Sequence, residues 1–166
     1  FHYGELAGTY KIGGYYHTGK FTDFRDGSGV RGNYSFYVVV DQALLNQSPD
    51  APRLAGFFRA SYSPQEERNT VYFYVEGGIN LFAPFPGRDE DVAGVGLFYT
   101  DFSDDAVRDL QLTEPQVNDS ESVLEIFYQA QITPWLSLKP EFQYIFDPMF
   151  AKDDAILFGT RLEISL

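Results

Sequence analysis

Hydrophobic and polar residues alternate with a period of two along most of the chain. The clearest example is the segment 124–146, LEIFYQAQITPWLSLKPEFQYIF, in which every second residue is apolar and the residues between include glutamate, glutamine and lysine. A period of two is that of a β-strand, whose successive side chains point to opposite sides of a sheet. The break at Thr133 and Pro134 therefore predicts two strands joined by a tight turn.

The same period predicts eight strands, near residues 9–20, 33–45, 54–63, 70–82, 92–102, 121–132, 135–146 and 155–166. The segments between them carry turn-forming residues, and eight of the nine prolines fall there or at strand edges. Pro140 is the exception. Because proline has no backbone N–H, we expect a local bulge or a missing ladder hydrogen bond at this position. In the longest connection, 103–120, the run DAVRDLQL predicts one or two helical turns.

The two faces of the predicted strands differ in charge. One face has no charged residue, and its members include Ile12, Val38, Phe58, Leu97, Ile126, Phe142 and Leu162. The opposite face carries lysine, arginine, glutamate, glutamine and tyrosine. Each strand therefore has one apolar and one water-facing side.

This alternation alone also fits a soluble antiparallel sandwich or small barrel with its apolar face inside. Three features favour an antiparallel transmembrane β-barrel with the apolar face outside. Most apolar runs extend over about 9 to 11 residues, which is the length that crosses a bilayer at barrel tilt. Tyrosine and phenylalanine lie toward the ends of these runs, as in interfacial girdles. The alternation of the last strand also continues to the final residue, Leu166.

A sheet can span lipid only if it closes, because every backbone polar group must find its partner within the protein. Eight strands either close as a narrow barrel filled with side chains or form half of a wider barrel. If the C-terminus lies in the periplasm, the segments 22–32 and 103–120 lie outside and the Thr133-Pro134 turn lies in the periplasm.

The composition further narrows the class of protein. The 166 residues suit one domain, here a single barrel region over 1–166, and the chain has no cysteine for a disulfide or a thiolate metal site. The formal net charge is −12, and the 12 lysines and arginines are spread along the chain, which argues against a nucleic-acid partner. No apolar run approaches the roughly 20 residues of a membrane-spanning helix. The chain opens on FHYGELAG without the features of a signal peptide, so we expect a mature or truncated piece.

Several segments carry a family resemblance: GTYKIGGYYHTGKF, GNYSFYVVVDQAL, FFRASYSP, RNTVYFYVEGGIN, FPGRDEDVAGVGLFY and LEIFYQAQITPWLSLKPEFQYIFDP. In order, and over essentially the whole chain, they resemble the carbohydrate-selective outer-membrane porins of the OprB type. The resemblance implies the C-terminal half of a Gram-negative porin of about 16 strands, through which monosaccharides such as glucose diffuse. The implied partners are outer-membrane lipid, monosaccharides, the N-terminal half of the same barrel and, as an option, further copies of the chain. No cofactor is implied.

The polar face is the candidate pore wall. A pyranose offers C–H faces that stack on aromatic rings and hydroxyls that bind charged and amide groups. The candidate pore-lining and sugar-contacting residues are Lys11, Tyr15, His17, Tyr37, Asp41, Arg59, Tyr72, Tyr74, Glu76, Glu125, Gln129, Lys139, Glu141 and Arg161. The alternative for each of them is a solvated wall whose charges only pair across strands, for instance Lys139 with Glu125 or Glu141 with Arg161.

Neither metal binding nor catalysis is predicted. The charged run 88–91 lacks the spacing and the glycine of a calcium loop, so we expect a solvated turn there. The chain has only two histidines and no nucleophile-elbow motif, which leaves no basis for a hydrolytic triad. Paired glutamates on the wall lie near Lys139, and nothing in a wide wet lumen raises one pKa for acid catalysis.

Overall fold

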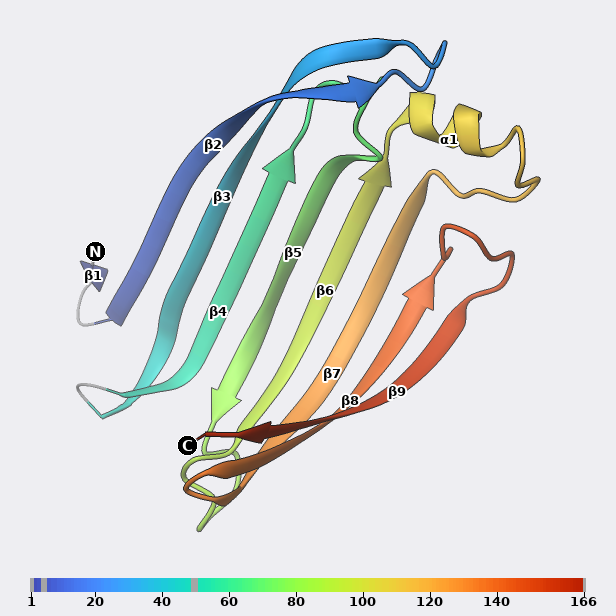
Figure 1. Cartoon of the computed structure of the whole chain (residues 1–166). Coiled ribbons are helices and arrows are strands. Elements are labelled where there is room, and N and C mark those ends of the chain that lie inside the picture. The colour runs from blue at the N-terminus through green and yellow to red at the C-terminus, as the bar shows by residue number, and fades with distance from the viewer. Residues whose placement is uncertain (1, 4–5, 49–50, 166) are drawn as a thin grey trace.

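The computed structural model describes residues 2–3, 6–48 and 51–165, which form one antiparallel sheet with a short helix (Figure 1). Strands that follow one another in the chain are neighbours in the sheet, from β1 to β9. The elements are β1 (His2–Tyr3), β2 (Leu6–Thr22), β3 (Gly29–Ser48), β4 (Ala51–Tyr62), β5 (Val71–Phe82), β6 (Val92–Phe102), α1 (Asp104–Leu110), β7 (Ser120–Thr133), β8 (Leu136–Phe146) and β9 (Ala155–Ile164). No helix in these ranges is long and apolar enough to cross a membrane.

All eight predicted strands are present, and the predicted helical turns correspond to α1. The largest differences are in β2 and β3, which extend to 17 and 20 residues. Their pairing continues past a register shift between His17 and Lys20, so polar residues that interrupt the alternation still join the ladder. The two-residue strand β1 was not predicted. Leu166, the last residue of the predicted alternation, lies outside the described residues.

The sheet is an open trough in which long connections and α1 lie at one end and shorter turns at the other (Figure 1). Within the described ranges β9 pairs with β8 and β2 pairs with β1 and β3, so the first and last long strands do not meet. The alternative of a narrow barrel closed by these strands alone is therefore wrong for the described part of the chain. Within residues 2–3, 6–48 and 51–165 the sheet has the form of a barrel segment whose two edge strands, β1 and β9, each pair on one side only.

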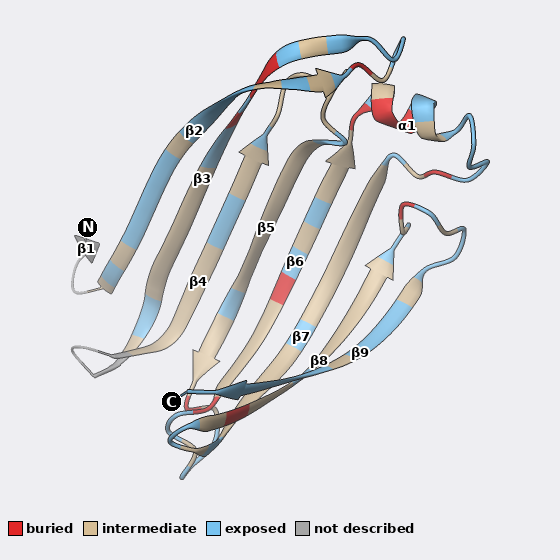
Figure 2. Ribbon diagram, in the orientation of Figure 1, coloured by how far each residue is buried: buried red, intermediate tan, exposed pale blue. Residues whose placement is uncertain are grey.

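The strand register keeps the two predicted faces continuous across the sheet. Residues directly opposite each other share a face, as Ile12, Val38 and Ala60 do on one side. Figure 2 shows exposed and partly exposed residues along the strands, and the apolar face includes Ile12 at 90% and Phe158 at 81% exposure. The buried hydrophobic residues among those described all lie in connections or α1: Ala83, Ala106, Val107, Val117 and Met149. This apolar face has no second layer of described residues over it, unlike the face of a sandwich.

Pro140 interrupts the ladder on one side, as predicted. The pairs between β7 and β8 pass from Phe127 with Glu141 to Ala130 with Leu138, and the positions in between are not bridged. On the other side β8 pairs continuously with β9, with Pro140 opposite Thr160. Since the register is the same before and after the gap, there is no bulge. The missing ladder bond is confirmed, and it faces β7.

We expect Pro140→Val to stabilise the sheet, because valine supplies an N–H toward β7 at a position where the ladder lacks a bond. The free energy of unfolding should rise by about 0.5–1.5 kcal/mol, the net value of one hydrogen bond. The measurement is urea unfolding of the folded protein. Pro148→Val, in the connection after β8, is the control, and equal or lower stability for Pro140→Val would contradict the assignment.

The connections at the α1 end bind one another. Ser103 is 1% exposed. Its hydroxyl caps α1 by accepting a hydrogen bond from the N–H of Ala106 (3.1 Å), and it donates a hydrogen bond to the carbonyl of Glu66 (2.9 Å). The side-chain amide of Asn118 donates to the carbonyl of Pro148 (2.8 Å). Three neighbouring connections are thus joined into a fixed rim above the strands.

Asp23 binds Arg25 within the connection between β2 and β3, and this contact makes the stability of that connection depend on pH. Its pKa is lowered from 3.8 to about 2 by hydrogen bonds from the Arg25 side chain and backbone N–H. A lowered pKa means that the contribution to stability is complete above the unfolded value of 3.8 and is lost as the pH falls toward 2. We expect amide protection in residues 23–28 to persist down to about pH 4 and to fall between about pH 4 and pH 2. Hydrogen exchange measures this. Asp23→Asn should lower protection at neutral pH and remove the dependence, and an unchanged profile in that variant would contradict the role.

Candidate pore wall

Crowding in the middle of the sheet, on β5 and β6, indicates that the polar face is the concave one, because side chains converge on the inside of a curved sheet. A methyl group added at Gly94 would lie 2.5 Å from Phe127 Cζ, and one at Gly78 would lie 2.7 Å from the Phe57 ring. These glycines are on the polar face. A methyl group at Gly77, on the apolar face, meets nothing closer than 3.4 Å. The polar side chains therefore point into the trough, and we call this face the polar wall.

The first charged cluster of the polar wall is centred on Arg59 of β4. Its guanidinium donates to Glu76 Oε1 (Nη1 to Oε1, 2.6 Å) and lies 3.6 Å from Asp41 Oδ1. The hydroxyl of Tyr74 donates to the other oxygen of Glu76. The structure thus brings together four of the predicted wall residues, from three neighbouring strands.

The second cluster is centred on Lys139 of β8. Its ammonium nitrogen lies 3.3 Å from Glu125 Oε1 and 3.5 Å from Glu141 Oε2, and 3.9 Å from the centroid of the Phe127 ring. The amide of Gln143 donates to the second oxygen of Glu125 (2.8 Å). The expected pair of Lys139 with Glu125 is confirmed. Glu141 binds Lys139, and not Arg161 as expected, since Arg161 lies directly opposite Lys139 in the ladder and the lysine reaches Glu141 on its own strand.

The remaining predicted residues join neither cluster. Lys11, Tyr15, Tyr37, Gln129 and Arg161 lie on the polar wall by register, opposite Val39, Ser35, Gly13, Val92 and Lys139. His17 lies at the bulge in β2, where its Nδ1 accepts from the backbone N–H of Gly19 (3.0 Å). The hydrogen bond with Gly19 holds the His17 ring at the bulge, and His17 contacts neither charged cluster.

Tyr72 is not brought to the polar wall. The register between β5 and β6 shifts between Val71 and Phe73, so the period of two fails there. The ring of Tyr72 packs edge-on against Tyr62 with centroids 5.1 Å apart, and the two hydroxyls are 3.3 Å apart. Tyr62 lies opposite Phe73, on the apolar face. The Tyr72 ring therefore belongs to the rim of that face.

The turn between β5 and β6 exposes Asp89 and Glu90, as expected for a solvated turn at 88–91, but it buries Asp91. Asp91 is 2% exposed and accepts hydrogen bonds from Arg88 Nε (2.6 Å), from the N–H of Gln131 (2.9 Å) and from the hydroxyl of Tyr128. These contacts fasten the turn to β7. No local sequence signal predicts this, because the partners of Asp91 on β7 are about 40 residues away.

Sequence reasoning also missed the phenylalanines of the wall. Phe57, Phe98 and Phe127 lie on the polar wall, opposite Gly78, Glu76 and Gly94 respectively. The signal was present in the sequence, since Gly94 and Gly96 repeat with the strand period at positions where a side chain would face the lumen.

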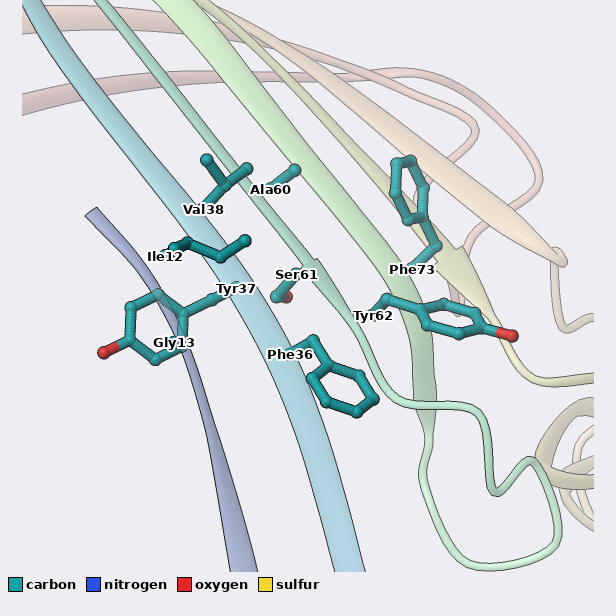
Figure 3. A pocket seen from close by; sticks show the side chains of 9 residues that line it. All are labelled: Ile12, Gly13, Phe36, Tyr37, Val38, Ala60, Ser61, Tyr62 and Phe73. Atoms are coloured by element: carbon teal, nitrogen blue, oxygen red, sulfur yellow. The ribbon is translucent and has the colours of Figure 1, made fainter. Parts of the chain in front are cut away.

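The apolar face has a hollow of different chemistry. Ala60 forms its floor, and the side chains of Ile12, Phe36, Val38 and Phe73 surround it (Figure 3). This hollow offers hydrocarbon surface on the side of the sheet away from the charged clusters. Among the described residues no group of three or more histidine, aspartate or glutamate side chains is placed to hold a metal ion.

Comparisons with known proteins agree with this geometry. The sequence model of the family described as "Carbohydrate-selective porin, OprB family" matches residues 1–166. Porin B of Pseudomonas aeruginosa is 27% identical over 188 residues, covering 96% of this chain and 41% of that protein. A structure of Pseudomonas putida OprB, solved at high pH, has a TM-score of 0.84 and 23% identity, covering 96% of this chain and 44% of that one. The fold is thus that of part of a porin barrel, and the chain spans about two fifths of Porin B.

Proposed function

Because the chain belongs to the carbohydrate-selective porins of the OprB family, we propose that it forms part of the wall of an outer-membrane pore through which monosaccharides such as glucose diffuse passively. The rest of the barrel is supplied by an N-terminal half of the same polypeptide. The observation that carries the proposal is the division of one curved sheet into a concave wall of paired charges and a convex apolar face.

The apolar face supports a position in lipid. Large side chains such as Leu97 (60% exposed) and Ile126 (48% exposed) have no layer of described residues over them. An isolated cation at the midplane of a bilayer costs about 2–4 kcal/mol, and the described residues of this face carry none there. Tyr16, Tyr34 and Tyr62 lie toward the α1 end of the same face, where an interfacial girdle is expected. Outer-membrane lipid is therefore the natural surrounding of this face.

The polar wall supports passage of neutral, hydroxyl-rich solutes. Arg59 and Lys139 each have carboxylate partners in the wall, so a sugar hydroxyl can exchange with an existing contact at little cost. Conduction requires sites that bind weakly enough for the solute to leave. A wall of ion pairs meets that requirement better than unpaired charges do.

The test is transport by the full-length protein in lipid bilayers. We expect ion conductance that glucose reduces in a concentration-dependent manner, and swelling of vesicles in glucose that is faster than in sucrose. No conductance, or a protein that is monodisperse without detergent, would contradict the proposal.

A further inference from the structure

Three phenyl rings lie on glycines in the middle of the polar wall. The Phe57 ring covers Gly78, and the Phe127 ring covers Gly94, each so closely that a methyl group could not be inserted. The rings of Phe57 and Phe98 both reach within 3.4 Å of the point where a Cβ of Gly96 would be. We call Phe57, Phe98 and Phe127, with these glycines beneath them, the phenyl floor.

The phenyl floor lies between the two charged clusters. One ladder row across the sheet runs through Asp41, Phe57, Gly78, Gly96, Glu125 and Gln143. Arg59 and Glu76 border the floor in the next row, where Glu76 is opposite Phe98. An apolar surface about two rings wide is thus flanked on both sides by groups that donate and accept hydrogen bonds.

The rings are not equivalent. Lys139 lies over the face of Phe127, at 3.9 Å from its centroid, so that face is covered. The guanidinium carbon of Arg59 also lies over the Phe57 ring, at 5.3 Å from its centroid, which is within cation–π range but farther away than the ammonium of Lys139 is from Phe127. The more accessible part of the floor is therefore made by Phe98 and by Phe57, whose cation is the more distant one, and Phe127 forms the border with the second cluster.

We propose that Phe57 and Phe98 form a seat for the flat face of an uncharged pyranose. The inference rests on the proposed function and names the residues that select the solute. The face of a phenyl ring carries negative charge density that attracts the C–H groups of a sugar ring. The equatorial hydroxyls at the rim of the sugar reach Arg59 and Glu76 on one side and Glu125 and Gln143 on the other. A flexible polyol has the same kind of hydroxyls but no rigid apolar face, so it gains less binding free energy from this seat.

The charge of the clusters restricts the seat to neutral sugars. The two clusters contain the cations Arg59 and Lys139 and the carboxylates of Asp41, Glu76, Glu125 and Glu141. Carboxylates exceed cations by two, so a sugar acid or sugar phosphate meets net repulsion beside the floor.

Aromatic rings over glycines also have a purely structural explanation, since such pairs relieve crowding and fill the space of a missing side chain in curved sheets. The two explanations predict different results for leucine substitutions. Leucine keeps apolar volume over the glycine but has no π face. A packing role is then largely preserved, and a stacking role is lost.

The experiment compares Phe57→Leu and Phe98→Leu with Phe58→Leu in the full-length porin. Phe58 is the next residue of the same strand and points to the apolar face, so it is a matched control. Potassium chloride conductance in planar bilayers reports whether each variant folds and inserts. The readout is the concentration at which glucose, and separately its acyclic alcohol glucitol, halves that conductance.

We expect Phe57→Leu and Phe98→Leu to weaken the glucose effect by about 2- to 10-fold, the value of one aromatic stacking contact, with little change for glucitol. Phe58→Leu should leave both values unchanged. Suppose that the wild-type pore conducts ions and responds to glucose, and that all three variants respond to glucose as the wild type does. This result would overturn the proposed seat and leave the proposed function standing. A wild-type protein without conductance overturns the proposed function itself.

Discussion

Leu97→Arg is expected to lower the free energy of unfolding of the full-length porin in lipid vesicles by about 2–4 kcal/mol, the cost of an arginine near the bilayer midplane. Leu97 lies in the middle of β6 on the apolar face, opposite Leu124 of β7, and is 60% exposed. An arginine there has neither water nor a carboxylate of the wall within reach. The measurement is reversible urea unfolding in phosphatidylcholine vesicles.

The matched control is Val123→Arg. Val123 lies one residue from Leu124 on β7 and faces the polar wall, opposite Phe98. An arginine at this position points into water beside the carboxylates of the wall, and we expect a change within about 0.5 kcal/mol, as for other surface substitutions. Equal losses for the two arginine variants would show that the apolar face does not meet lipid.

Lys139→Met is expected to make the pore more selective for cations. The ammonium is the only cation in contact with Glu125 and Glu141 among the described residues, so methionine leaves two carboxylates without a countercharge. One unit charge at about 4 Å in water is worth about 1 kcal/mol, so the potassium-to-chloride permeability ratio should rise by up to about fivefold. Reversal potentials under a salt gradient across a planar bilayer measure the ratio.

Lys152→Met removes the same charge from the connection between β8 and β9, outside the wall. We expect it to change the ratio much less than Lys139→Met does. If the two variants shifted the ratio equally, the effect would come from the overall charge of the protein and the second cluster would have no local role in selectivity.

Periodicity predicted most of the fold because both faces of the sheet are chemically distinct from end to end. A strand such as β7 alternates residues like Glu125 and Ile126 between its two faces, and this pattern is visible without any knowledge of the neighbouring strands. The prediction for Pro140 held for the same reason, since the loss of a donor is a property of the residue itself. Where the alternation shifts, as at Tyr72, the assignment of faces failed, because a bulge is set by the partner strand.

The site was less accessible to sequence reasoning because its chemistry depends on which strands are neighbours. The sequence shows Glu125 and Glu141 as candidate partners of Lys139, but the strand register determines that Lys139 binds both. Asp91 looked like part of a solvated turn until β7 supplied Tyr128 and Gln131. Phenylalanines on a polar wall contradict simple alternation, and they are explained only by the glycines that pairing places beneath them.

The most direct test of the account is cysteine scanning of β7 in the full-length porin reconstituted in vesicles. The chain itself contributes no cysteine, so a single one introduced at each position from 121 to 130 is the only thiol of this segment. A charged, water-soluble thiol reagent is added and its reaction rate is measured at each position. We predict rapid reaction at the wall positions 121, 123, 125, 127 and 129 and slow reaction at the lipid-facing positions 122, 124, 126, 128 and 130. Equal rates at both sets, or faster reaction at the second set, would contradict the assignment of a lumen-facing polar wall and a lipid-facing apolar face.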